Sequence, residues 1–305
     1  MGLKKRLIRF FQDKIGIGEN RDKIKELESR ISYQNQLIQR VLPEIFPMTQ
    51  EEKAHGYAFL KELGLADQPD LSIHKNDIMF RLSYYRTGGD LRRTLQAYLK
   101  TGYEIARDIS SIANEKGVEA KSFLDFGAGY GRVSRFFPFT LPGARIWVSE
   151  IKPQSLDFLK DRFAFSPILH SETPNSLVLP EKMDIIFAGS VFTHLPKALF
   201  EPWLDTLLNG LEDNGILIFS THNKLDYPEA KGDFHFTESS EDTFMVEVED
   251  RLEDAKKYGV TYVSDRYIRD LLNSKDQISW ESRRLAFGKT QDLVICQKVS
   301  TINPA

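Results

Sequence analysis

The sequence has few of the residues that mark several common kinds of protein site. It contains a single cysteine, Cys296, so no disulfide can form within the chain, and a buried thiol in a reducing cytoplasm is the expected state. Its six histidines and one cysteine lack the spacing of zinc ligands, and we expect no metal site. A net charge of only −3 favours no nucleic-acid partner. No apolar run approaches the length of a membrane span.

The most informative segment is residues 122–150. A short apolar run ends at Asp125, and three glycines follow at alternate positions, Gly127, Gly129 and Gly131. A second apolar run ends at Glu150. The order of strand, glycine turn, helix, strand and acid is typical of a nucleotide-cofactor site. The alternative is an ordinary connection between a strand and a helix.

The glycine spacing and the two acids favour a cationic cofactor over a dinucleotide. The pattern G-x-G-x-G is tighter than the G-x-G-x-x-G of pyrophosphate binders. The Asp125 carboxylate would repel a diphosphate and attract an ammonium or a sulfonium. Glu150 can accept hydrogen bonds from both hydroxyls of a ribose. S-adenosylmethionine carries both cations and no phosphate, so the sequence predicts it as the cofactor.

The sequence LDFGAGYGRVSRF resembles the first motif of the class I S-adenosylmethionine-dependent methyltransferases, with Glu150 in the place of their ribose-binding acid. Residues 183–196, MDIIFAGSVFTHLP, resemble their fourth strand and the turn after it, and residues 215–223, GILIFSTHN, resemble their fifth strand. The resemblance extends over residues 119–299. It is closest to a group of bacterial methyltransferases, several of which are associated with glycan assembly.

The resemblance implies an α/β fold, with a Rossmann-like, mostly parallel sheet of seven strands and helices on both faces. One strand of the last pair is expected to be antiparallel. An all-helical N-terminal region precedes this core. We expect amphipathic and coiled-coil helices in residues 1–46, a helical cap or lid in 47–118, and the core in 119–299. An insertion at 224–258 is expected to shape the substrate pocket, and a helix over 196–211 is expected to have Thr193 as its cap.

The resemblance also implies a set of cofactor-binding residues. The family's adenine-binding Asp is absent from LHSETPN, so Ser171 or Glu172 would substitute for it. In the family a Tyr or Arg of the lid often meets the methionine carboxylate, and Tyr84, Tyr85 and Arg86 are the candidates here. The alternative is that Tyr84 and Tyr85 are core aromatics. Arg132 is expected to pair with that carboxylate or with a surface acid. The complete predicted set is Asp125, Gly127, Ala128, Gly129, Gly131, Arg132, Glu150, Ile151, Ser171, Glu172, Gly189, Ser190, Tyr84 and Arg86.

Two histidines are candidates for a general base, because they follow the fourth and fifth strands at the mouth of the expected site. These are His194 and His222, and His235 in the insertion is a third candidate. Histidine titrates near neutral pH, as a base should. The alternatives are that each ring only braces its turn, and that the reaction proceeds by proximity and desolvation without a base.

We therefore predict methyl transfer from S-adenosylmethionine to a hydroxyl of a sugar, a glycan or another small polar molecule. The alternatives are a nicotinamide-dependent oxidoreductase or epimerase, and a non-catalytic scaffold. The basic amphipathic pattern of residues 3–15 suggests contact with an anionic membrane surface, and the heptads of residues 21–42 suggest a homodimer. The expected location is the cytoplasm, and the alternative is a peripheral position at the inner face of the membrane.

Overall fold

The computed structural model describes residues 45–65, 69–238 and 259–299, and the predictions for residues 3–15 and 21–42 lie outside these ranges. The chain divides into two compact units. Among the described residues, the smaller unit contains 45–47 and 73–76, where Ile45 and His74 form an isolated antiparallel bridge. All other described residues belong to the larger unit, which holds both the helices after residue 48 and the sheet.

Three helices precede the sheet in the larger unit: α3 (Gln50–Glu62), α4 (Ile78–Arg86) and α5 (Leu91–Glu115). Each begins at a side chain that accepts a hydrogen bond from a free backbone N–H of the first turn. Thr49 does so for α3 in a capping box with Glu52, Asp77 for α4 and Asp90 for α5. The predicted helical region is therefore present where the structure describes it, and it shares a compact unit with the sheet.

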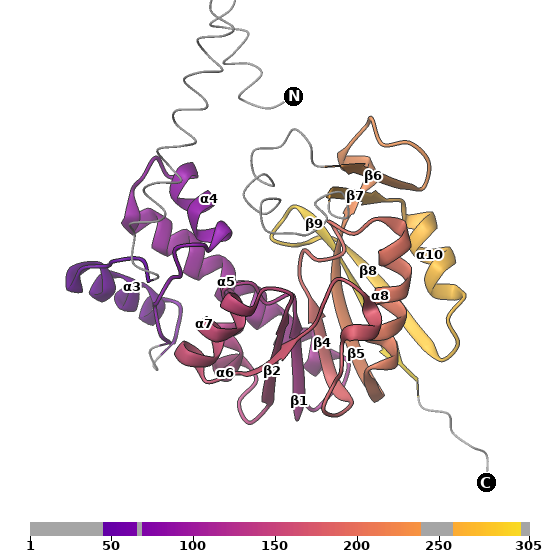
Figure 1. Ribbon diagram of the computed structural model, residues 1–305, viewed down its shortest axis with the longest axis horizontal. Helices are drawn as coiled ribbons and strands as arrows, with labels where there is room; N and C mark the ends of the chain where they lie inside the picture. Colours follow the sequence, from indigo (N-terminus) through magenta and orange to yellow (C-terminus); the bar gives the residue numbers. More distant parts are fainter. Residues whose placement is uncertain (1–44, 66–68, 239–258, 300–305) are drawn as a thin grey trace, which may run out of the picture. The chain divides into compact units, whose positions relative to one another are not determined.

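Within the described ranges, nine strands form the sheet. Helices and 3-10 turns connect them (Figure 1). The strands are β1 (Ser122–Phe126), β2 (Arg145–Glu150), β3 (Ser166–Leu169), β4 (Met183–Ala188), β5 (Leu211–Asn223), β6 (Phe234–Glu238), β7 (Gly259–Val263), β8 (Ile278–Phe287) and β9 (Gln291–Lys298). The connecting elements are η1 (Ser134–Phe136), α6 (Phe137–Thr140), α7 (Pro153–Phe163), η2 (Pro174–Ser176), α8 (Lys197–Asn209), η3 (Lys224–Asp226) and α10 (Asp265–Asn273).

Seven of these strands form the predicted sheet. The parallel order is β3-β2-β1-β4-β5, and β9 then pairs antiparallel with residues 216–221 of β5 and carries β8 on its other edge. The prediction of a Rossmann-like α/β fold with one antiparallel strand is therefore confirmed. The remaining two strands were not predicted: the last residues of β5 pair with β7, which carries β6. β6 lies within the predicted insertion, of which residues 239–258 lie outside the described ranges.

Helices cover both faces of the sheet, because alternate residues of each strand point to opposite sides. On one face, Leu124 and Phe126 of β1 share a hydrophobic cluster with residues of α8 and α10. On the other, the Phe123 ring lies 4.2 Å from that of Phe137 in α6, and Val148 of β2 packs on α7. Cys296 is buried in β9, as expected. Within the described residues, no helix is both long and apolar enough to cross a membrane.

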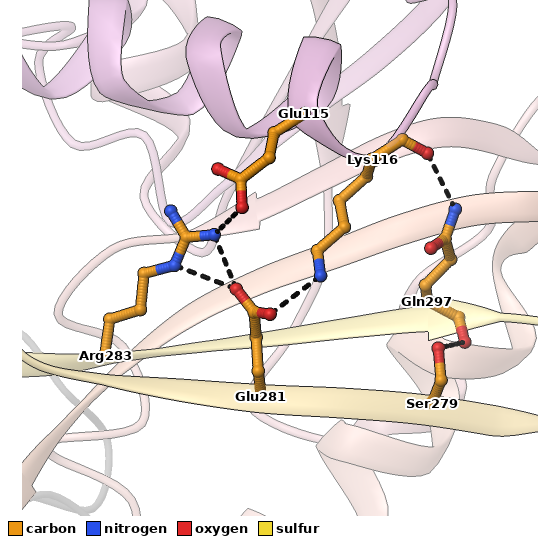
Figure 2. A network of polar contacts seen from close by, with 6 residues as sticks. All are labelled: Glu115, Lys116, Ser279, Glu281, Arg283 and Gln297. Atoms are coloured by element: carbon orange, nitrogen blue, oxygen red, sulfur yellow. Dashed lines mark hydrogen bonds and ion pairs between the residues drawn. The ribbon is translucent and has the colours of Figure 1, made fainter.

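A polar network attaches the end of α5 to the last two strands (Figure 2). Glu281 of β8 lies at its centre, 2.8 Å from the Lys116 ammonium and 2.5 Å from the Arg283 guanidinium. Arg283 also pairs with Glu115 at 2.5 Å, and the Gln297 amide of β9 donates to the Lys116 carbonyl. This network connects residues far apart in the sequence and holds α5 against the outer part of the sheet.

Candidate active site

The carboxyl ends of the parallel strands bring most of the predicted residues to one edge of the sheet, where open α/β folds bind their ligands. Asp125 lies near the end of β1, and Glu150 is the last residue of β2. Gly189 directly follows β4, and His222 is the next-to-last residue of β5. The site is therefore built from four neighbouring strands and the turns after them.

The three glycines of the turn after β1 all have positive φ, but their surroundings differ. A Cβ at Gly127 would lie 2.5 Å from Val191, and one at Gly131 would lie 2.7 Å from Leu159. These two glycines are therefore needed for packing as well as for backbone conformation. A Cβ at Gly129 would meet no atom within 4 Å. The backbone around Gly129 is thus the part of the turn that a ligand can approach.

Glu150 is tied directly to this open part of the turn. Its Oε1 accepts a hydrogen bond from the Gly129 N–H at 3.0 Å, and its Oε2 accepts one from the Ile151 N–H at 2.9 Å. A carboxylate has about four lone-pair positions, so about two remain for other donors. The neighbouring Ala128 N–H bonds the Ser149 carbonyl at 3.2 Å. Glu150 can therefore accept a pair of hydroxyl groups while it keeps the turn in place.

Asp125 is a buried carboxyl with a protein donor and no protein cation. Its side chain is 3% exposed, and the Ser134 hydroxyl donates to its Oδ2 at 2.5 Å. Burial raises the pKa of Asp125 to about 7. The Ser134 hydrogen bond opposes this shift, and the charge of Glu150 makes the smallest contribution, which raises the pKa. A ligand cation beside this group would favour its ionised form. The acid is therefore suited to an ammonium or a sulfonium.

Arg132 and Arg86 are near enough to affect each other's charge. Burial lowers the pKa of Arg132, the neighbouring Tyr98 and Asp77 oppose this shift, and the positive charge of Arg86 adds a smaller lowering. Within the described parts of the chain, the Arg132 guanidinium makes no hydrogen bond or ion pair. Tyr84 instead lies against Gly89, and Tyr85 is 81% exposed. Of the predicted lid side chains, Arg86 is thus the one whose charge acts on Arg132.

The two candidate bases are brought together at the ends of β4 and β5. The Nδ1 of His194 lies 2.8 Å from the carbonyl oxygen of Gly259, the first residue of β7. Burial lowers the pKa of His222 to about 4, and the neighbouring His194 contributes to this shift. Burial also lowers the pKa of His194. Both rings are therefore neutral near pH 7, as a proton acceptor must be.

The third candidate base is already engaged. The Nδ1 of His235 accepts from the Lys231 N–H at 3.3 Å, and its Nε2 lies 3.0 Å from the Thr237 hydroxyl. With both ring nitrogens in hydrogen bonds, His235 is a poorer proton acceptor than His194.

The expected N-terminal cap of α8 is wrong. The helix begins after Pro196, and the Thr193 hydroxyl instead donates to the Ser190 carbonyl.

The remaining predicted residues lie at the same edge of the sheet, and several of their polar groups are already hydrogen bonded within the protein. The Ser171 hydroxyl lies 3.0 Å from that of Thr173, and the Glu172 carbonyl accepts from the Trp203 indole. A Cβ at Gly189 would lie 2.5 Å from Phe187, so this glycine is required by packing. The Ser190 N–H donates to the Ser220 hydroxyl at 2.7 Å, with φ at +59°. Their contacts with a cofactor stay predictions.

Sequence reasoning missed a buried arginine behind the glycine turn. Arg135 is 1% exposed, and its Nε donates to the Gly131 carbonyl at 2.8 Å. It also missed His170 beside Ser171, whose buried ring stacks on Phe126 with centroids 4.9 Å apart. Each lies within one to four residues of a predicted position. Nothing in the sequence separates Arg135 from the exposed arginines of this chain.

A protein-family model matches the part of the chain that contains the glycine turn and Glu150. Residues 124–217 match the family model described as a methyltransferase domain. A malonyl-[acyl-carrier protein] O-methyltransferase of Acetivibrio thermocellus is 22% identical over 138 residues, which are 45% of this chain and 48% of that protein. The chain thus spans about half the length of this curated relative. The matched residues lie within the segment 119–299 over which the sequence resembles the class I methyltransferases, and they support that resemblance.

Two solved structures are similar at low identity. An S-adenosylmethionine-dependent methyltransferase from Clostridium acetobutylicum is 14% identical, with a TM-score of 0.47 and coverage of 65% of this chain and 92% of that one. The 1,6-didemethyltoxoflavin-N1-methyltransferase of Burkholderia thailandensis, solved with its substrate and S-adenosylhomocysteine, is 15% identical. Its TM-score is 0.48, with coverage of 84% of this chain and 93% of that one.

Proposed function

We propose that this chain, whose residues 124–217 form a methyltransferase domain, transfers the methyl group of S-adenosylmethionine to a hydroxyl of a sugar, a glycan or a similar small polar molecule. The observation that carries the proposal is the arrangement of Asp125, Gly129 and Glu150. It combines an acid suited to a cation, an open backbone position and an acid with free acceptor sites.

The residues fit the groups of this cofactor one by one. Glu150 would hold the ribose hydroxyls, and Asp125 would lie beside the ammonium or the sulfonium. Arg132 and Arg86 would bind the cofactor carboxylate, which explains why the Arg132 guanidinium needs no partner within the described residues. A diphosphate would face two carboxyl groups at this edge of the sheet, and that disfavours the nicotinamide alternative.

The chemistry of the chain's own residues is the removal of a proton. The bound cofactor would supply a methyl group already activated by its sulfonium. The protein must hold the acceptor oxygen in line with that methyl group and exclude water. Because the Gly259 carbonyl accepts a hydrogen bond from His194 Nδ1, Nε2 carries the lone pair. His194 would therefore take the hydroxyl proton, and His222 is the second candidate.

A row of aromatic rings beside the two histidines supports an acceptor site there. Tyr262 of β7 is the register partner of both His222 in β5 and His235 in β6. The Tyr227 ring stacks on Tyr262 with centroids 4.7 Å apart, and the His222 ring lies 5.3 Å from Tyr262. Tyrosine combines a flat apolar surface with a polar tip, which suits a ring that carries hydroxyls. The O-methyltransferase activity in the relative's name also supports an oxygen acceptor.

Isothermal titration with S-adenosylhomocysteine and with NAD tests the cofactor. We expect micromolar binding of the former and none of the latter. Binding of NAD alone would support the oxidoreductase alternative, and binding of neither would support the scaffold. Transfer of labelled methyl groups to a panel of mono- and oligosaccharides then tests the acceptor. His194→Asn should lower the rate by about 10²–10⁴-fold if His194 is the base.

A further inference from the structure

A buried relay of polar side chains connects the start of α4 to the glycine turn. Asp77 caps α4 through Oδ1, which accepts from the Phe80 N–H at 3.0 Å. Its Oδ2 accepts from the Tyr98 hydroxyl at 2.5 Å. Arg135 Nη2 donates to the same hydroxyl at 3.3 Å, and Arg135 Nε donates to the Gly131 carbonyl. All three side chains are at most 3% exposed.

The other N–H groups of Arg135 donate to backbone carbonyls of the segment before α4 and of the glycine turn. Its Nη1 donates to the carbonyls of Asp70 and Ser72, both at 3.2 Å, and its Nη2 reaches the Tyr130 carbonyl. The guanidinium also lies 5.0 Å from the centre of the Phe163 ring. Each nitrogen of this buried cation is thus hydrogen bonded, and Asp77 supplies a compensating charge across one phenol group.

Both ends of the relay adjoin the arginines of the candidate site. Gly131, whose carbonyl Arg135 holds, directly precedes Arg132, and the helix that Asp77 caps ends at Arg86. Arg132 lies within the electrostatic reach of Tyr98 and Asp77. Within the part of the chain that the structure describes, neither Arg132 nor Arg86 forms an ion pair with a carboxylate. Two such cations repel each other, so their separation has to be maintained by the surrounding structure.

We infer that Asp77, Tyr98 and Arg135 are positioning residues, which hold Arg132 and Arg86 at the separation that a bound amino-acid carboxylate requires. The inference rests on the proposed function. It assigns the relay to one end of the cofactor only. We assign the adenosine end to Glu150 and the Gly129 N–H, which bond each other; within the described residues, the relay side chains bond the carbonyls of Tyr130 and Gly131 but neither of these two groups.

Because the relay is assigned to the amino-acid end of the cofactor alone, two ligands that differ at that end test the inference. S-adenosylhomocysteine carries the amino-acid carboxylate, whereas 5′-methylthioadenosine has the same adenosine without it. Tyr98→Phe removes one hydroxyl from the relay and keeps the ring. We expect it to weaken S-adenosylhomocysteine binding about tenfold in titration calorimetry and to leave the affinity for 5′-methylthioadenosine unchanged within about twofold.

The matched control lies on the same helix. Tyr103 of α5 packs edge-on against Phe136, and its hydroxyl makes no hydrogen bond within the described residues. Tyr103→Phe should bind both ligands like the parent chain. Arg132→Gln should reproduce the selective loss, and Tyr98→Phe added to it should weaken binding by less than twofold more, because both act on one contact.

The outcomes separate the inference from the proposed function. If the parent chain does not bind S-adenosylhomocysteine, the proposed function fails. If the parent chain binds it and Tyr98→Phe either weakens both ligands equally or weakens neither, the relay has only a structural role and the inference is wrong. Thermal melting of each variant in the absence of ligand shows whether a loss of affinity follows from unfolding.

Discussion

Oε1 of Glu150 accepts a hydrogen bond from the Gly129 N–H at 3.0 Å, so the acid at the end of β2 and the open position of the glycine turn are joined before any ligand binds. The part of the candidate site to which we assign the ribose is therefore preformed. A preformed acceptor pair lowers the entropy that a ligand would otherwise lose in ordering the site.

Glu150→Gln should weaken binding of S-adenosylhomocysteine by about 10–100-fold, or roughly 1.4–2.8 kcal/mol. The amide keeps the size of the side chain, but it replaces one acceptor oxygen with a donor that opposes either the Gly129 N–H or a ribose hydroxyl. Titration calorimetry measures the loss. Glu181→Gln, which alters an exposed acid paired with Arg145, is the control and should leave the affinity unchanged. Equal affinities for the parent and Glu150→Gln would remove Glu150 from the site.

Substitutions at Gly131 and Gly129 should distinguish a glycine that packing requires from one that ligand approach requires. Gly131→Ala places a methyl group 2.7 Å from Leu159 at a positive φ, and should lower the free energy of unfolding by about 2–4 kcal/mol. Gly129→Ala meets open space, so it should cost only the backbone strain of about 1–2 kcal/mol while it obstructs the ligand. Urea unfolding and titration calorimetry give the two readouts. A Gly129→Ala variant with parental affinity would contradict this assignment.

Binding of S-adenosylhomocysteine should release a proton near neutral pH. The pKa of Asp125 is about 7 without ligand, and the ligand ammonium would lower it, so the carboxyl loses its proton as the complex forms. The affinity should therefore rise with pH up to about 7 and level off above it. Calorimetry in buffers of different ionisation enthalpy counts the protons. Asp125→Asn should abolish this release, and an unchanged release in that variant would assign the proton to another group.

The buried Asp125 carboxyl also makes the ligand-free protein less stable as pH rises. Folding raises the pKa of Asp125 from 3.8 to about 7, so the folded state binds the proton more tightly than the unfolded chain. This contribution is complete below pH 4 and is lost as pH rises through 7, by up to about 4 kcal/mol. Urea unfolding of the parent and of Asp125→Asn at pH 5 and pH 8 measures the difference.

His222 should titrate well below the ordinary range of histidine. The pKa of His222 is about 4, because burial and the neighbouring His194 both disfavour its charged form. Its stabilising contribution is therefore present above pH 6.5 and is lost as pH falls towards 4, since the unfolded chain takes up the proton first. Two-dimensional ¹H–¹⁵N spectra of the imidazole rings between pH 4 and pH 8 check this. A midpoint of His222 near 6.5 would refute its burial against His194.

The network around Glu281 should contribute little to stability, in spite of its several ion pairs. Glu281→Gln removes the partner of Lys116 and Arg283, whose side chains are 22% and 33% exposed. Partly exposed pairs are worth about 1 kcal/mol or less and weaken with added salt. Thermal melting at 50 mM and 500 mM NaCl compares the variant with the parent. A large loss that salt does not alter would show that the network acts as a buried unit.

The cofactor half of the site could be predicted because its signals are local. Each apolar run ends at an acid, and the glycines fix the turn, so Asp125, Gly129 and Glu150 follow from spacing alone. The reasons for individual glycines could not be predicted. Gly131 is set by Leu159, a contact that exists only once α7 has packed against the turn.

The parts that were missed depend on contacts between distant segments. Arg135 binds carbonyls of residues 70 and 72, so its burial cannot be inferred from neighbours such as Arg132. The strands β6 and β7 were not expected because residues 224–258 show no clear period, and their pairing is with the end of β5 and with each other. Thr193 was assigned to a helix cap, but Ser190 three residues earlier takes its hydroxyl.

The strand β5 changes neighbours along its length, and this has an evolutionary consequence. Residues 216–221 pair with β9, whereas His222 and Asn223 pair with β7. The ribbon of β6 and β7 is also bonded to the turn after β4, because the N–H groups of Gly259 and Thr261 donate to the carbonyls of His194 and Thr193. Chimeras that exchange residues 224–258 between related chains leave Gly259 beside His194 and the residues assigned to the cofactor in place, so they should keep the cofactor and change the acceptor.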